Sequence, residues 1–245
     1  TWKTACIGII FSISILTLLP LIRQYTIIGS SGDMHSHLGY MIDILHTGHI
    51  SGNMYPIAHI LGVTFHQICG LDLYTSMLSW PIIIFVIYVS SYYLLCRIVL
   101  KCKTSILICM MLAPLTVNAS PTMINSLPFF APQALSDYFV IFVLYLFFSR
   151  SISFRRNTTN FGILIVVTSI MITFFHPLTT LFLIFCFSIF EISYHIIKRI
   201  KLDLELYVRT SAQLILILLA IFFSWDSYAK ALVGTFNRVN SWLYE

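Results

Sequence analysis

Charge is what this sequence has least of. Only 9% of its 245 residues are charged, whereas 58% are hydrophobic and 15% are aromatic. Soluble domains carry about 25% charged residues, and a soluble chain of this length would need more of them to cover its surface. The deficit excludes an ordinary soluble domain, a coiled coil and a disordered chain, and it indicates an integral membrane protein.

Two further absences exclude other classes of protein. The six cysteines include no CxxC pair, so we interpret them as small buried hydrophobic residues and not as a disulfide framework or a zinc site. The lysines and arginines stand in short clusters between apolar runs, with no long basic stripe interleaved with aromatic residues. This pattern excludes a nucleic-acid partner.

Long apolar runs are what the sequence does contain. A membrane-spanning helix needs about 17–25 mostly apolar residues, and we expect about seven such spans. They cover residues 6–22, 75–96, 104–118, 131–149, 161–175, 178–197 and 210–225. As one helix, residues 161–197 would reach roughly 55 Å, against a hydrocarbon core of about 30 Å. The chain must therefore fold back, and His176-Pro177 is the predicted corner.

The basic residues are unevenly distributed between the two sides of this arrangement. Most of the 14 lysines and arginines fall on one side, namely Lys3, Arg97, Lys101, Lys103, Arg150, Arg155, Arg156, Lys198, Arg199, Lys201 and Arg209. The other side receives Arg23, Lys230 and Arg238. By the positive-inside rule the first side is cytoplasmic. We therefore expect a multi-pass protein with a cytoplasmic N-terminus and a functional face that is outer or lumenal.

The first outer loop, between the first two spans, carries most of the eight histidines. Residues 34–47 predict an amphipathic helix along the membrane surface, between Asp33 and Gly48 as its caps. Its apolar face is predicted to hold Met34, Leu38, Met41, Ile42 and Leu45, and its polar face Ser36, Tyr40, Asp43 and Thr47. Residues 56–70 predict a second short helix, with His59 and His66 on one face. The expected fold is therefore an all-α transmembrane bundle with two juxtamembrane helices.

Residues 32–72, GDMHSHLGYMIDILHTGHISGNMYPIAHILGVTFHQICGLD, resemble the first outer loop of the GT-C class of membrane glycosyltransferases. This class includes dolichyl-phosphate-mannose-dependent mannosyltransferases, aminoarabinose transferases and oligosaccharyltransferases. Asp33 matches the acidic position soon after the first span, Tyr55-Pro56 the turn between the two juxtamembrane helices, and Gly70-Leu71-Asp72 the entry to the second span. The resemblance covers roughly residues 1–100 with motifs and the rest of the chain by topology.

The resemblance implies an inverting sugar transfer at the outer face. The donor would be a polyprenyl-phosphate-linked sugar, and the acceptor a glycan, a lipid or a protein. Asp33 would be the catalytic base that takes the proton of the acceptor. Because Asp is also a common residue at the start of a helix, Asp33 is equally well explained as a helix cap. The candidate substrate-binding residues are His37, Tyr40, Asp43, Tyr55, His59, Asp137, His176, Arg23 and Arg238.

Several of these residues have a purely structural interpretation as well. Asp43 is explained equally well as part of a solvated helix face, and His176 as part of a corner between two helices. Arg23 is explained as an anchor at the membrane interface. Asp137 falls inside a predicted span, where a carboxylate is costly and usually faces a cavity or a partner. His35 and His37 could be ligands of a divalent cation, although two residues so spaced on a helix point in nearly opposite directions. We expect Glu191, near the cytoplasmic end of its span, either to pair with Lys198 or to extend its side chain toward the membrane surface.

Two alternatives to a transferase remain: a transporter, with Asp137 on an ion path, and a non-catalytic membrane subunit. A polar path through the bundle would favour the transporter, and a lipid-accessible cleft beneath the surface helices would favour the transferase. We expect residues 1–245 to form one transmembrane domain, with the first span and outer loop in 1–74 and the remaining bundle in 75–245. Because the chain begins at Thr1 and ends just after an apolar span, we expect a piece of a longer protein.

Overall fold

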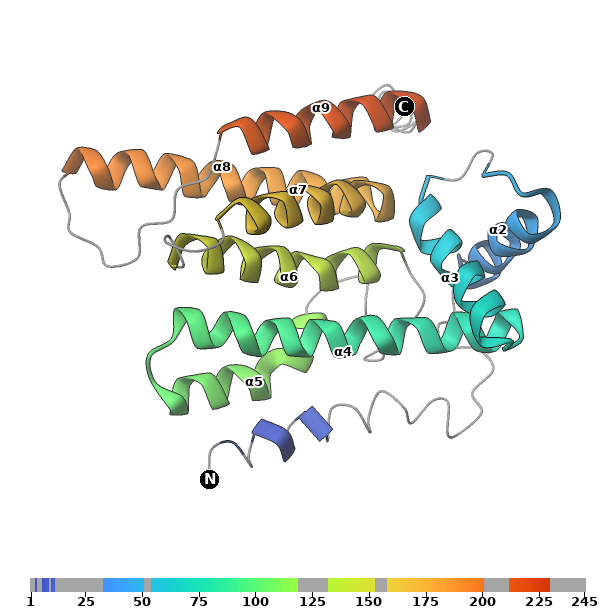
Figure 1. The fold of residues 1–245 in the computed structure, drawn as a ribbon, viewed down its shortest axis with the longest axis horizontal. Coiled ribbons are helices and arrows are strands. Elements are labelled where there is room, and N and C mark those ends of the chain that lie inside the picture. Colours follow the sequence, from blue (N-terminus) through green and yellow to red (C-terminus); the bar gives the residue numbers. More distant parts are fainter. Residues whose placement is uncertain are drawn as a thin grey trace, which may run out of the picture.

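The computed structural model describes residues 3, 6–8, 10–11, 33–50, 54–118, 132–152, 158–200 and 212–229. These residues form helices and connecting segments without a strand, which confirms the all-α prediction for them. The helices are α2 (Asp33–Thr47), α3 (Pro56–Cys69), α4 (Leu73–Val99), α5 (Lys103–Asn118), α6 (Pro132–Ile152), α7 (Thr158–Phe175), α8 (Pro177–Ile200) and α9 (Ala212–Ala229). Figure 1 shows α4 to α9 side by side, with α2 and α3 grouped at one end of this bundle.

Three of these helices are long and apolar enough to cross a membrane: Leu73–Val99, Pro132–Ser149 and Pro177–Ile200. Shorter apolar helices are found at Lys103–Ala113, Asn160–Phe175 and Ala212–Trp225. Six of the predicted spans therefore coincide with helices of the bundle. The predicted first span at 6–22 lies largely outside the described residues.

Local sequence explains how α3 and α4 begin and end. Pro56 occupies the first turn of α3, where its missing N–H costs nothing. Gly70 ends α3 with φ +65°, and its N–H donates to the His66 carbonyl at 3.0 Å. Asp72 then caps α4, because its carboxylate accepts the backbone N–H of Thr75 at 2.9 Å. Two successive caps therefore turn the chain sharply from α3 into α4.

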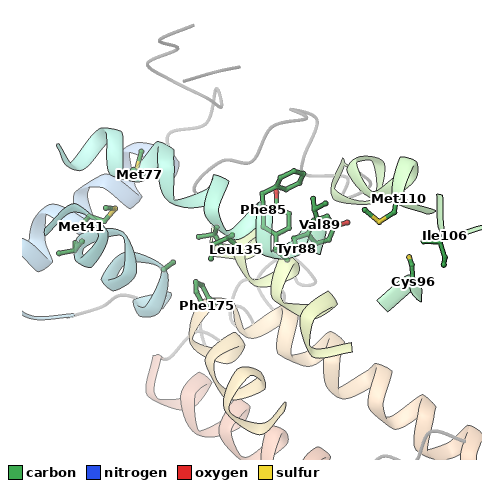
Figure 2. Packing of buried hydrophobic residues seen from close by; sticks show 14 residues of the cluster. Met41, Met77, Phe85, Tyr88, Val89, Cys96, Ile106, Met110, Leu135 and Phe175 are labelled. Carbon is green, nitrogen blue, oxygen red and sulfur yellow. The ribbon is translucent and has the colours of Figure 1, made fainter. Parts of the chain in front are cut away.

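A first apolar core joins α2 and α3 to the bundle. Met41 of α2, Met77 of α4 and Phe175 of α7 are all fully or almost fully buried in it. Figure 2 shows this cluster, in which Phe85 and Tyr88 of α4 lie close to Leu135 of α6. The two surface helices are therefore packed onto the bundle by apolar side chains and are part of the same core.

A second apolar core holds α6 to α9 together. Val143, Ile172, Leu183 and Leu218 contribute one fully buried or almost fully buried side chain from each of these helices. Among the residues that remain exposed are many large apolar side chains, such as Phe185 at 63% and Leu216 at 65%. Outward-facing apolar side chains are what a lipid-facing helix requires, because lipid tails are as apolar as they are.

The two ends of the bundle carry different residues. At one end lie α2, α3, the α7–α8 corner and the C-terminal end of α9, and we refer to it as the α2–α3 end. The indole Nε1 of Trp225 in α9 donates there to the Met54 carbonyl at 3.3 Å. At the other end α4 and α8 finish and α5 begins, with the basic side chains Arg97, Lys101, Lys103, Lys198 and Arg199. We refer to this second end as the basic end.

Candidate functional site

Five candidate residues from distant parts of the chain meet at the α2–α3 end. They are His37 and Tyr40 of α2, Tyr55 and His59 at the start of α3, and His176 at the α7–α8 corner. We refer to these five as the histidine cluster. His59 is its centre and is fully buried.

His59 is held by hydrogen bonds on both of its ring nitrogens. Its Nδ1 lies 2.9 Å from the Tyr55 carbonyl oxygen, and its Nε2 lies 3.0 Å from Nδ1 of His37. A carbonyl oxygen only accepts, so Nδ1 of His59 carries the proton, and Nε2 of a neutral His59 accepts. His37 must then donate through its own Nδ1. The contacts therefore define a directed chain from His37 through His59 to the Tyr55 carbonyl.

The charge state of His59 agrees with this direction. Burial, reinforced by the neighbouring His37, lowers the pKa of His59 from 6.5 to about 4, although the hydrogen bond to the Tyr55 carbonyl acts in the opposite sense. His59 is therefore neutral at physiological pH. A neutral imidazole with its proton fixed on Nδ1 orients His37 without adding charge to the site.

Aromatic contacts enclose the cluster. The ring of Tyr40 lies 5.2 Å from the ring of His59, and the ring of Tyr55 stacks on His176 at 5.2 Å with an interplanar angle of 16°. Burial lowers the pKa of His176 to about 4, and its buried Nδ1 has no hydrogen-bond partner in the part of the chain that the structure describes. The cluster thus contains a neutral imidazole nitrogen with unused hydrogen-bonding capacity.

The face that α2 turns inward agrees in part with the one predicted, because Leu38, Met41 and Leu45 pack into the first core. Tyr40 was predicted on the polar face, but it is half-buried and contacts His59. Ile42 was predicted on the apolar face, but it is 39% exposed. The inward face of α2 therefore also includes His37, Tyr40 and Ile44, because α3 packs against that side of the helix.

Other candidates lie elsewhere. Asp43 is exposed on α2, and His35, His46 and His49 are exposed as well. The backbone of Asp33 begins α2, one residue earlier than predicted, and its side chain lies outside the described residues. Arg23 and Arg238 also lie outside them. Glu191 pairs with His195 at 3.3 Å and not with Lys198, because His195 is one turn away on the same face.

Asp137 is placed in a second polar group, between α6 and α8. Thr179 Oγ1 donates to Asp137 Oδ1 at 2.9 Å and lies 2.8 Å from Ser136 Oγ. No described hydrogen bond or ring contact joins Asp137 to the histidine cluster. Sequence reasoning missed Ser136 and Thr179, although a polar pair near the start of two predicted spans, Ser136-Asp137 and Thr179-Thr180, was a usable signal.

Within the described segments, no three side chains of His, Cys, Asp or Glu come close enough together to hold a metal ion. The divalent cation that the sequence left open therefore has no ligand set among those residues. Comparisons of the chain with protein-family models, with curated proteins and with solved structures gave no match.

Proposed function

We propose that this chain is the membrane domain of a GT-C-like glycosyltransferase that works at its α2–α3 end. The observation that carries the proposal is the directed chain from His37 through His59 to the Tyr55 carbonyl. It is assembled from the loop whose sequence resembles that class, and it lies against the bundle and not out in solvent. Preorganised polar groups beside an aromatic wall are typical of a binding site.

The proposal includes seven spans and an orientation. Residues 6–22 would form the first span, and α4 to α9 would form the other six. The basic end would face the cytoplasm, because lysines and arginines accumulate on that side of membrane proteins. The histidine cluster would then face the outer or lumenal side, where a lipid-linked sugar donor presents its headgroup.

The proposed reaction is an inverting displacement at the anomeric carbon of the sugar. The carboxylate of Asp33 takes the proton from the acceptor hydroxyl, and the acceptor oxygen forms a bond to the anomeric carbon. The bond between that carbon and the donor phosphate oxygen breaks, and polyprenyl phosphate leaves with the bonding electrons. Asp33 precedes His37 by one helical turn on α2, which brings the base and the histidine cluster to the same part of the loop.

In this proposal the histidine cluster binds the donor headgroup. His37 and Tyr40 are half-buried and project from α2 toward α3. The ring of His37 is held in one orientation by its bond to His59, so that it meets a substrate without first losing rotamer freedom. Tyr55 stacked on His176 supplies a flat wall of the kind against which a sugar ring packs.

The test is sugar transfer by the purified chain in vesicles supplied with polyprenyl-phosphate mannose or polyprenyl-phosphate aminoarabinose. Asp33→Asn keeps the size of the side chain but removes the base, and we expect a loss of about 10²–10⁴-fold. Asp72→Asn is the matched control, because it makes the same substitution at the cap of α4. Full transfer by the Asp33→Asn protein would contradict the proposal.

A further inference from the structure

A cavity of about 750 Å³ lies between α6 and α8, apart from the histidine cluster. Its volume is within the range of about 300–1,000 Å³ that small-molecule sites occupy. We refer to it as the Asp137 groove. Its polar groups are the side chains of Gln133, Asp137, Thr179 and Ser188, and the rest of the lining is apolar and comes from α8. The Ser188 hydroxyl donates to the Ile184 carbonyl of its own helix at 2.8 Å.

Three of the four polar side chains of the groove lie at one end of it, and the fourth, Ser188, is hydrogen-bonded within α8. Asp137 and Thr179 lie within the first two turns of α6 and α8, at the α2–α3 end. From Leu178 to Ser188 the lining continues along α8 for about 15 Å. This length is about half of a hydrocarbon core. The groove therefore has a polar head near one membrane interface and an apolar body that reaches toward the middle of the bilayer.

The apolar body opens outward. Leu178, Phe182 and Phe185 line the groove and are 60%, 55% and 63% exposed. Both α6 and α8 are long and apolar enough to span a membrane. In a bilayer these side chains contact lipid, so the groove is entered from the membrane and not from water.

The hydrogen-bonding groups at the polar head determine which kind of lipid headgroup would fit the groove. The Thr179 hydroxyl donates to Asp137 Oδ1, and the Ser136 hydroxyl, which donates to the Gln133 carbonyl, lies 2.8 Å from Thr179 Oγ1. Asp137 lines the groove, and among the described residues no hydrogen bond is made to its second carboxylate oxygen, Oδ2, which is the acceptor that remains for a ligand. A carboxylate repels a phosphate and accepts a hydroxyl. The polar head is therefore complementary to a lipid alcohol and not to a lipid phosphate.

We propose that the Asp137 groove is a binding site for a lipid alcohol, whose hydroxyl group donates to Asp137 and whose chain lies along α8. Because the groove is built from α6 and α8 alone, this site does not depend on sugar transfer at the histidine cluster. Its ligand also differs from a polyprenyl-phosphate donor, which would bring a negative charge to a carboxylate.

Two photoactivatable, clickable probes with identical acyl chains test the proposal: diacylglycerol and phosphatidic acid. Each is added at the same mole fraction to vesicles that contain the full chain, and labelled peptides are identified by mass spectrometry. We expect diacylglycerol to label α8 about tenfold more than phosphatidic acid, which is the discrimination that one hydrogen bond to a charged acceptor provides. Equal labelling by the two probes would overturn the proposal.

Two variants locate the effect. Asp137→Asn still accepts the Thr179 hydroxyl but presents an amide in place of the free carboxylate oxygen, and the preference for diacylglycerol should fall to about twofold or less. Leu181→Trp fills the apolar body and should lower labelling by diacylglycerol. Leu216→Trp is its matched control on α9, where the side chain is 65% exposed outside the groove. An unchanged preference in Asp137→Asn, or equal labelling of the two Trp variants, would contradict the site.

Discussion

The α2–α3 end and the basic end of the bundle place ionisable side chains in opposite environments. At the α2–α3 end His59 is fully buried, neutral and hydrogen-bonded on both ring nitrogens. At the basic end Arg97, Lys101, Lys103, Lys198 and Arg199 are exposed. Exposed cations determine which way a helix bundle inserts, whereas buried imidazoles stabilise one arrangement of the segments around them. We infer that orientation is encoded at one end and binding at the other.

The largest difference between the two ends should appear when one side chain is removed from each. His59→Ala leaves a cavity and removes the partner of both His37 and the Tyr55 carbonyl, so it should lower the free energy of unfolding by about 2–4 kcal/mol. Lys103→Ala at the basic end should leave it nearly unchanged, because the side chain is exposed. Denaturant unfolding in detergent measures both, and equal losses would remove the distinction between the two ends.

Acidification should also act on the α2–α3 end. Because the pKa of His59 is about 4 in the folded chain and about 6.5 in the unfolded chain, the unfolded state binds the additional proton between these two values. Stability should therefore fall as the pH decreases from about 6.5 to about 4, by about 3 kcal/mol for this residue, and then level off. The unfolding free energy of His59→Gln should depend less steeply on pH, whereas an identical profile would show that His59 titrates normally.

A smaller effect is expected at the turn from α3 into α4. Hydrogen bonds from the hydroxyl and the backbone N–H of Thr75 lower the pKa of Asp72. Asp72→Ala removes the cap and should lower the thermal unfolding midpoint slightly, while Asp72→Asn should retain most of the capping bond. The two midpoints compared at pH 7 test this, and equal midpoints would show that the cap contributes nothing measurable.

We expect the smallest effect on stability at the pair of His195 and Glu191, toward the basic end of α8. His195 is 67% exposed and contacts Glu191 across one helical turn. Such pairs contribute about 0.3–0.5 kcal/mol, and salt screens them. His195→Gln should therefore change the unfolding free energy by no more than this at low salt and by less in high salt. A loss above about 1 kcal/mol would indicate a structural role that the exposed contact does not explain.

Local patterns predicted most of the helices. The apolar runs predicted α4 to α9, His176-Pro177 predicted the corner between α7 and α8, and Gly48 was correctly predicted to follow α2. These features depend on residues within one or two turns of each other, where helix length and backbone conformation are decided.

Long-range contacts were not predictable in the same way. The bond between His37 and His59 spans 22 residues, and the bond between Asp137 and Thr179 spans 42. Both depend on which helices pack together, and periodicity within one helix carries no such information. Tyr40 shows the consequence: it was predicted on the polar face of α2, and the wheel of α2 could not reveal that its ring would pack against His59 of α3.

The central claim, that the two ends face opposite sides of a membrane, can be tested with two native cysteines. Cys69 ends α3 and Cys102 precedes α5, and both are exposed. Hydrogen bonding from the backbone of Ser105 lowers the pKa of Cys102, which favours its reaction with a maleimide. Variants that keep only one of the two cysteines are treated with a membrane-impermeant maleimide on intact cells. We expect Cys69 to be labelled at once and Cys102 only after permeabilisation; labelling of Cys102 in intact cells, or of both cysteines from one side, would contradict the account.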